Sequence, residues 1–156
     1  MEISFLMLGG NIGDRIEYLS RCIELLRSNV GRIVTMSSVY ESEPWGFDDS
    51  LWFLNQVIAV ETDLTPNDLL GITQNIEKQL GRCRTNETLS VVEDPDRGRY
   101  NKMYNSRTID IDILLYGDVI INTPSLEIPH PRINDRMFVL QPMATVKAQI
   151  SVLLPS

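Results

Sequence analysis

The feature that most constrains this chain is an alternation of isoleucine and aspartate within residues 107–117, Arg-Thr-Ile-Asp-Ile-Asp-Ile-Leu-Leu-Tyr-Gly. Isoleucine at every second position predicts a β-strand, because successive side chains of a strand point to opposite faces. Asp110 and Asp112 would then share one face, with Cα atoms about 7 Å apart. So apolar a strand is expected inside the domain, where an ionised carboxylate is costly unless it is paired or bound to metal.

Two explanations of this acidic pair stay open on the strand alone. Two carboxylates on a rigid strand suit Mg²⁺, which commonly takes one or two carboxylates and completes its coordination shell with water and phosphate. A strand with one solvent-facing side can also carry two aspartates for solubility only.

The composition indicates one globular domain over residues 1–156 and argues against several classes of partner. The chain is 43% hydrophobic, which is enough for a substantial core. A net charge of −7 without a basic block argues against nucleic-acid and anionic-membrane binding. The sequence has neither a membrane-spanning apolar run nor a signal-peptide pattern. Cys22 and Cys83 have no metal-type spacing, so we expect a reducing cytoplasm, with the protein as a monomer.

The predicted elements follow the order β-α-β-β-α-β, with C-terminal additions. Strands are predicted at residues 3–8, 33–40, 53–62 and 107–117, helices at 14–30 and 65–80, a short strand at 119–121, an extended segment at 127–131 and a short helix from 133. This order is that of a ferredoxin-like α+β sandwich, in which helices cover one face of an antiparallel sheet. Residues 82–106 show no periodicity, and a long loop of this kind is either a functional lid or a tolerated insertion.

Several polar groups could contribute to a binding site. Phe53 and Asn55 share one face of the third predicted strand, and an aromatic ring beside a carboxamide suits a flat heterocycle, although core packing and a chain turn would explain them too. Gln74 and Glu77 share a helix face. The turn at residues 9–15 matches no standard nucleotide-binding motif, so an ordinary tight turn is favoured over an anion site.

The cations of this acidic chain are concentrated next to the two aspartates. Of its 14 lysines and arginines, six lie within residues 82–107: Arg82, Arg84, Arg97, Arg99, Lys102 and Arg107. Such a concentration suits a metal-bound polyphosphate. His130, the only histidine, lies between two prolines and could be structural or could contact phosphate. The sequence contains neither a Ser-His-Asp set nor a Cys-His zinc spacing.

Taken in order, these motifs resemble the 6-hydroxymethyl-7,8-dihydropterin pyrophosphokinase family from about Phe5 to Pro142. The matching segments are Leu8–Arg15, Ser37–Tyr40 with Pro44 and Gly46, Phe53–Asn55, Gln74–Glu77, Gly81 with Arg82, Arg107–Leu114, Ile128–Arg132 with Arg136, and Phe138–Leu140 with Pro142. The chain departs from the family in having Gly10 where serine is common and Tyr104-Asn105-Ser106 where many members have Trp-Gly-Pro. Its loop at residues 83–106 is also longer than in the compact bacterial form.

The resemblance implies transfer of pyrophosphate from ATP to the hydroxymethyl group of a reduced pterin, with release of AMP. It implies two Mg²⁺ ions bound by Asp110 and Asp112, and a catalytic set of these two residues with Arg82 and Arg107. The implied pterin-binding residues are Ser42, Glu43, Trp45, Phe53, Asn55 and Phe138, and the implied ATP-binding residues are Gln74, Glu77, Arg84, Ile113, His130 and Arg136. A non-catalytic ferredoxin-like binding module and a two-metal phosphohydrolase are the alternatives.

Overall fold

The structure is a computed structural model that describes residues 1–43, 52–81, 108–131, 133 and 137–153, the side chains of 137–140, 152 and 153 excepted. Its strands are β1 (Glu2–Gly10), β2 (Gly31–Met36), β3 (Tyr40–Ser42), β4 (Phe53–Thr62), β5 (Asp110–Tyr116), β6 (Ile121–Asn122) and β7 (Glu127–Ile128). Its helices are α1 (Arg15–Asn29), α2 (Pro66–Gln79) and α4 (Met137–Leu153). Among these helices, none is long and apolar enough to cross a membrane.

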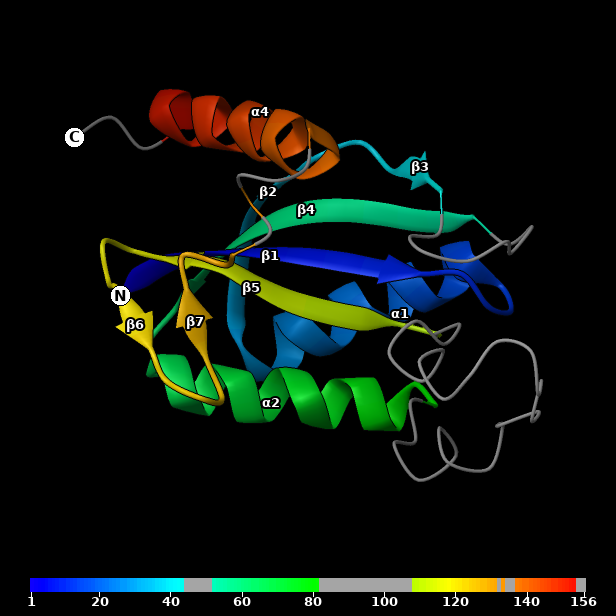
Figure 1. Cartoon of the computed structure of the whole chain (residues 1–156), viewed down its shortest axis with the longest axis horizontal. Coiled ribbons are helices and arrows are strands. Elements are labelled where there is room, and N and C mark those ends of the chain that lie inside the picture. Colours follow the sequence, from blue (N-terminus) through cyan, green and yellow to red (C-terminus); the bar gives the residue numbers. More distant parts are fainter. Residues whose placement is uncertain (44–51, 82–107, 132, 134–136, 154–156) are drawn as a thin grey trace, which may run out of the picture.

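The main sheet has the strand order β2-β4-β1-β5, with β3 also pairing with β4, and all of its pairings are antiparallel (Figure 1). Strands β6 and β7 form a separate two-stranded sheet. An antiparallel sheet with helices packed on it confirms the coarse prediction of a mixed helix-and-sheet domain. The predicted strand at 33–40 is divided, because at Ser37 the side-chain Oγ accepts the hydrogen bond from the Val57 backbone N–H at 2.9 Å.

The ends of the first two helices follow the predicted signals. The Asp14 carboxylate accepts a hydrogen bond from the Glu17 backbone N–H at 3.1 Å and so caps α1. Thr65 caps α2 in the same way through the Asp68 N–H at 3.2 Å, and proline follows at the first helical position. Gly13, with φ of 71°, makes the tight turn that was favoured for residues 9–15.

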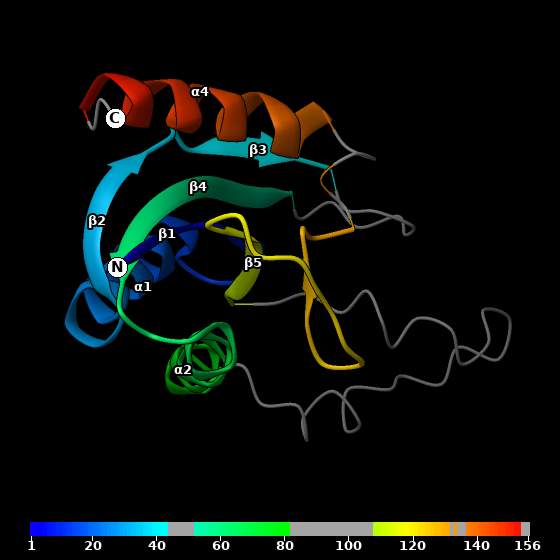
Figure 2. The same cartoon turned by 90° about the vertical axis from the view of Figure 1, so that its left-hand side faces the viewer.

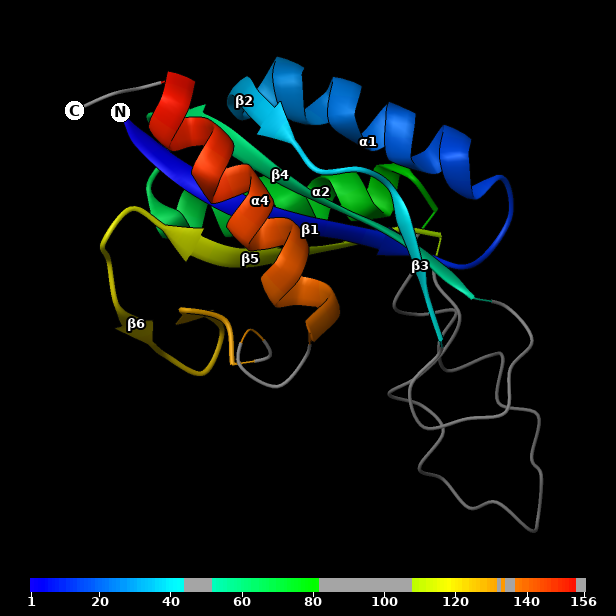
Figure 3. The same ribbon diagram turned by 90° about the horizontal axis from the view of Figure 1, so that it is seen from above.

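Helices cover both faces of the sheet. On one face, α1 and α2 enclose a core built mainly from alternate residues of the strands, such as Leu6, Ile58 and Ile111. On the other face, α4 packs on β2 and β4 around a smaller cluster that includes Val57 and Val146 (Figures 1–3). We therefore correct two predictions: the helices are not confined to one face, and the C-terminal helix has 17 residues. The intervening strand positions are apolar too, so the second face also needs a cover.

Candidate functional site

A row of four residues runs across the sheet on the face opposite α1 and α2. Its members, from one strand to the next, are Tyr40 in β3, Asn55 in β4, Gly9 in β1 and Asp110 in β5. Residues directly opposite each other in antiparallel strands have side chains on the same face, so this cross-strand row is one continuous surface. Asn55 and Asp110 are two strands apart, which places their Cα atoms about 10 Å from each other. The register thus brings together two site residues that are 55 positions apart in the sequence.

Gly9 forms the floor between Asn55 and Asp110. A Cβ atom at this position would lie 3.0 Å from the Oδ1 atom of Asn55, so a larger residue would displace that amide. With no side chain at Gly9, bare backbone separates the amide from the carboxylate. A flat molecule could lie on this floor and meet Asn55 at one end and Asp110 at the other.

The Asn55 side chain is buried and held by the neighbouring strand. Its Nδ2 atom donates hydrogen bonds to the Ser42 Oγ atom at 2.7 Å and to the Tyr40 carbonyl at 3.5 Å. Ser42 in turn pairs with Phe53, which shares the face of Asn55. Three predicted site residues therefore lie together where β3 meets the beginning of β4, and Glu43 follows on the surface.

The two aspartates lie on the face that the alternation predicts. Ile111 and Ile113 point into the helix-covered core and are 5% and 4% exposed. The side chain of Asp112 is 23% exposed, and Met7 lies opposite it on β1. Partly accessible oxygen donors on a rigid strand fit Mg²⁺, whose remaining ligands can be water and phosphate. No group of three or more His, Cys, Asp or Glu side chains converges within the residues that the structure describes.

His130 is placed beside Asp112 by backbone pairing at the outer edge of β5. Its N–H donates to the Leu114 carbonyl at 3.0 Å. Its Nε2 atom lies 3.8 Å from the Oδ1 atom of Asp112, an arrangement that is attractive when the imidazole is protonated. The extended segment at residues 127–131, which includes a cis peptide bond at Ile128–Pro129, thus reaches the acidic pair.

Glu77 reaches the same strand from the opposite face. Its side chain is only 5% exposed, and its Oε1 atom accepts a hydrogen bond from the backbone N–H of Ile111 at 3.2 Å. Ile111 lies between the two aspartates, so this buried carboxylate fixes the backbone that carries them. Gln74 is half-buried on the same helix, three residues before Glu77.

Other predicted site residues are placed less directly. The Ile113 side chain belongs to the core below α1 and α2, so contact with ATP would have to come from its backbone. Arg82, Arg84, Arg107, Arg136 and Trp45, like the loop at 83–106 with its cations, lie outside the described residues. Phe138 is part of α4, and its side chain also lies outside the described part of the chain.

Sequence reasoning missed Gly9 and Tyr40 as parts of this surface. The Tyr40 hydroxyl donates to the Met7 sulfur at 3.9 Å, and burial raises the pKa of the Tyr40 phenol above its ordinary value. Tyr40 and Gly9 belong to the site through strand register, which is a property of pairing between distant segments. Both residues lie in segments that match the family, Leu8–Arg15 and Ser37–Tyr40, and this was the one local signal that could have identified them.

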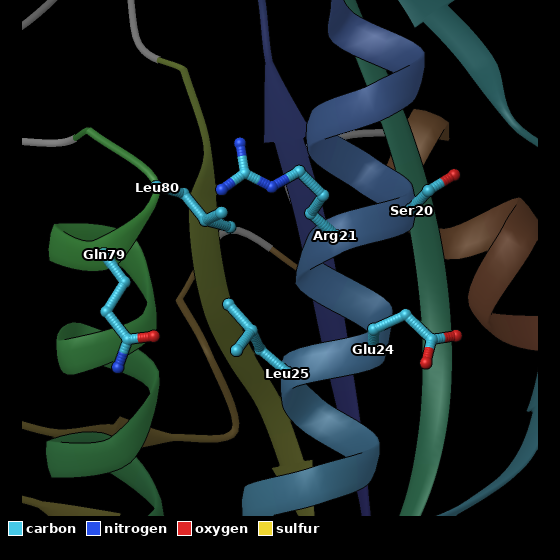
Figure 4. A pocket seen from close by; sticks show the side chains of 6 residues that line it. All are labelled: Ser20, Arg21, Glu24, Leu25, Gln79 and Leu80. Carbon is cyan, nitrogen blue, oxygen red and sulfur yellow. The ribbon is translucent and has the colours of Figure 1, made fainter.

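A groove of about 380 Å³ lies between α1 and α2, away from the aspartates. Figure 4 shows Leu25 and Arg21 of α1 facing Leu80, which follows α2. The remaining lining residues are Ser20, Glu24 and Gln79. Of the predicted site residues that the structure describes, none lines this groove, so the cross-strand row remains the candidate site.

Comparison with known proteins decides the family. The model of the family described as 7,8-dihydro-6-hydroxymethylpterin-pyrophosphokinase (HPPK) matches residues 5–148. The chain belongs to the HPPK family.

Named HPPK relatives match nearly the whole chain. A 2-amino-4-hydroxy-6-hydroxymethyldihydropteridine pyrophosphokinase of Porphyromonas gingivalis is 42% identical over 147 residues, covering 94% of this chain and 91% of that protein. The folic acid synthesis protein of Pneumocystis carinii is 38% identical over 149 residues, covering 96% of this chain but 18% of that protein. The HPPK sequence thus also occurs as a small part of a much longer protein.

A solved structure supports the fold of this HPPK chain. A crystal structure of an HPPK-DHPS in complex with substrates superimposes with a TM-score of 0.65 and 16% sequence identity. The match covers 95% of this chain and 40% of that chain. At this identity the likeness concerns the arrangement of helices and strands alone.

Proposed function

We propose that this chain transfers pyrophosphate from ATP to the hydroxymethyl group of 6-hydroxymethyl-7,8-dihydropterin, releasing AMP, in folate biosynthesis. The family match and the names of the relatives from Porphyromonas gingivalis and Pneumocystis carinii support this activity. The observation that carries it is the cross-strand row, in which a hydrogen-bonding amide and a carboxylate lie at opposite ends of a glycine floor.

The acceptor is proposed to bind at the Asn55 end of this row. The Asn55 amide oxygen offers an acceptor to the edge of a pterin, and the bonds from its Nδ2 atom to Ser42 and Tyr40 keep the amide oriented. Phe53, on the same face, supplies an aromatic plane for stacking. Family resemblance adds Glu43, Trp45 and Phe138 to this proposed acceptor site.

The donor is proposed to bind over β5. Asp110 and Asp112 would hold two Mg²⁺ ions, which when bound neutralise triphosphate charge and orient the phosphates. Glu77 keeps the backbone between these aspartates in place through the Ile111 N–H. The proposed contacts to ATP are Gln74, Arg82, Arg84, Arg107, His130, Arg136 and the backbone of Ile113, whereas Glu77 acts on the site through the β5 backbone.

The reaction requires the acceptor oxygen, the β-phosphorus of ATP and the departing oxygen to lie in line. The acceptor oxygen forms a bond to the β-phosphorus, while the bond from this phosphorus to the α,β-bridging oxygen breaks and AMP departs. Positioning and charge neutralisation account for most of the catalysis of such transfers. The acceptor hydroxyl loses a proton to a base, for which Asp110, in the same row as Asn55, is one candidate and a hydroxide held at the metal site is the other.

The remaining features of the proposal concern architecture and setting. The strand order β2-β4-β1-β5, with helices after β1 and β4, supports a ferredoxin-like arrangement within one domain. A cytoplasmic monomer is proposed from composition and cysteine usage.

A product assay tests the proposal. AMP should form only when ATP, Mg²⁺ and 6-hydroxymethyl-7,8-dihydropterin are all present, as measured by chromatography of the nucleotides. The matched control is 6-methyl-7,8-dihydropterin, which keeps the ring but lacks the attacking hydroxyl and should yield no AMP. Formation of ADP and phosphate without the pterin would instead identify a hydrolase, and no turnover at all would favour a binding module.

A further inference from the structure

Arg15 connects the beginning of α1 to both sides of the β3–β4 pairing. Its Nη1 atom donates a hydrogen bond to the Trp52 carbonyl at 2.8 Å and lies 3.9 Å from the Oε2 atom of Glu41. Glu41 is the middle residue of β3, and Trp52 immediately precedes β4. One guanidinium thus contacts two segments that meet at the Asn55 end of the cross-strand row.

These contacts lie next to the proposed acceptor site. Among the described residues, β3 pairs with β4 at three positions. The two residues that Arg15 contacts are each next to a site residue: Glu41 to Ser42, and Trp52 to Phe53. Ser42 holds the Asn55 amide through the 2.7 Å hydrogen bond. A shift of β3 relative to β4 would therefore move the groups that are proposed to bind the pterin.

Helix stability does not explain an arginine at this position. Arg15 is the first residue of α1, where the positive end of the helix dipole disfavours a cation. The Glu41 carboxylate is 54% exposed, and an exposed ion pair contributes little by itself. The Nη1 atom makes both contacts: it donates to the Trp52 carbonyl while the guanidinium charge faces the Glu41 carboxylate.

We propose that Arg15 is a positioning residue for the acceptor site, which it preserves by fixing β3 against the beginning of β4. It would not touch either substrate. The inference rests on the proposed function, since it assigns the effect of Arg15 to pterin binding. It extends that function to the turn between β1 and α1, for which sequence reasoning favoured only a tight turn.

Steady-state kinetics of four variants test this role. Arg15→Gln should raise the KM for the pterin about three- to tenfold, as expected for loss of one charge-assisted hydrogen bond, while kcat and the KM for Mg·ATP change less than about twofold. Arg15→Lys should recover part of the effect, and Glu41→Gln should have a smaller effect because the bond to the Trp52 carbonyl remains. The matched control is Arg32→Gln, which removes an exposed arginine 3.6 Å from Glu61 and should change neither KM.

Hydrogen exchange provides a measurement that does not depend on activity. Backbone amides of residues 40–42 and 53–55 should exchange faster in Arg15→Gln than in the wild type, and Arg32→Gln should leave them unchanged. An unaltered pterin KM with unaltered exchange would overturn the inference, as would an equal rise in both KM values. If the wild type made no AMP, the proposed function itself would be wrong. If the wild type made AMP and the Arg15 variants had the wild-type KM for the pterin, only this inference would be overturned.

Discussion

The two faces of the central sheet differ in what their side chains do. On the face covered by α1 and α2, the strands contribute apolar side chains to the larger core cluster. On the other face, α4 packs on β2 and β4. The cross-strand row on this face contains the Asn55 amide in β4 and the Asp110 carboxylate in β5. Because side chains alternate, single strands such as β5 supply both surfaces. Within one strand, substitutions at alternate positions are therefore expected to affect either the stability of the fold or the activity.

Glu77 connects the two faces. It projects from α2 among core residues, yet its hydrogen bond goes to the Ile111 N–H between the two aspartates. The outer edge of β5 is thus paired at Ile111 by a side chain and at Leu114 by the His130 backbone. These bonds satisfy backbone groups on the open side of an edge strand, which protects it from pairing with another chain, and they also hold the acidic pair in place.

The largest expected effect is on activity and comes from the polar face. Asp112→Ala should lower kcat/KM on the order of a thousandfold, because a proposed metal ligand is removed from the triphosphate site. Thermal unfolding should change little, since the side chain is partly exposed. The control is Asp118→Ala, an exposed aspartate in the turn after β5. Near-normal turnover by Asp112→Ala would remove the metal-binding role.

On the opposite face, the expected effect is on stability. Leu26→Ala should lower the free energy of unfolding by about 2–5 kcal/mol, because a fully buried side chain of α1 is truncated and leaves a cavity. Denaturant unfolding measures this change, and turnover per folded molecule should persist. In the same helix, Ile16→Ala serves as control, since Ile16 is 56% exposed. If both variants unfolded alike, the face covered by α1 and α2 would not hold the principal core.

At neutral pH the smallest expected effect is a pH dependence of stability within that core, because it appears only in alkaline solution. Burial, and secondarily the charge of Glu77, raises the pKa of the Cys22 thiol from 9.0 to about 12. Since the folded pKa is the higher one, this contribution to stability is complete below pH 9.0 and is lost as the pH rises to about 12. The difference in unfolding free energy between wild type and Cys22→Ala should therefore shrink over this range, by at most about 1.4 kcal/mol per pH unit. A constant difference would contradict this prediction.

The elements that were predicted best are those with local causes. The start of α1 after Asp14 and the start of α2 after Thr65 depend on side chains that bond to backbone groups three residues away. The alternation in β5 is likewise a property of neighbouring residues. The break after Met36 was missed because it involves Ser37 and Val57, which are distant in sequence. The extent of α4 was also missed, since its apolar residues acquire their role only against the second face of the sheet.

For the site, the residue types and the family can be inferred from the amino-acid sequence, because ordered motifs such as residues 107–114 and 128–132 are specific. The sequence also placed Asp110 and Asp112 on one face of a strand, since side-chain alternation is intrinsic to the extended backbone. Only the tertiary structure decided that Asn55, Gly9 and Asp110 lie in one row and that Arg15 reaches both Glu41 and Trp52. The physical reason is that register and layer packing depend on contacts between segments far apart in the chain, which no local pattern encodes.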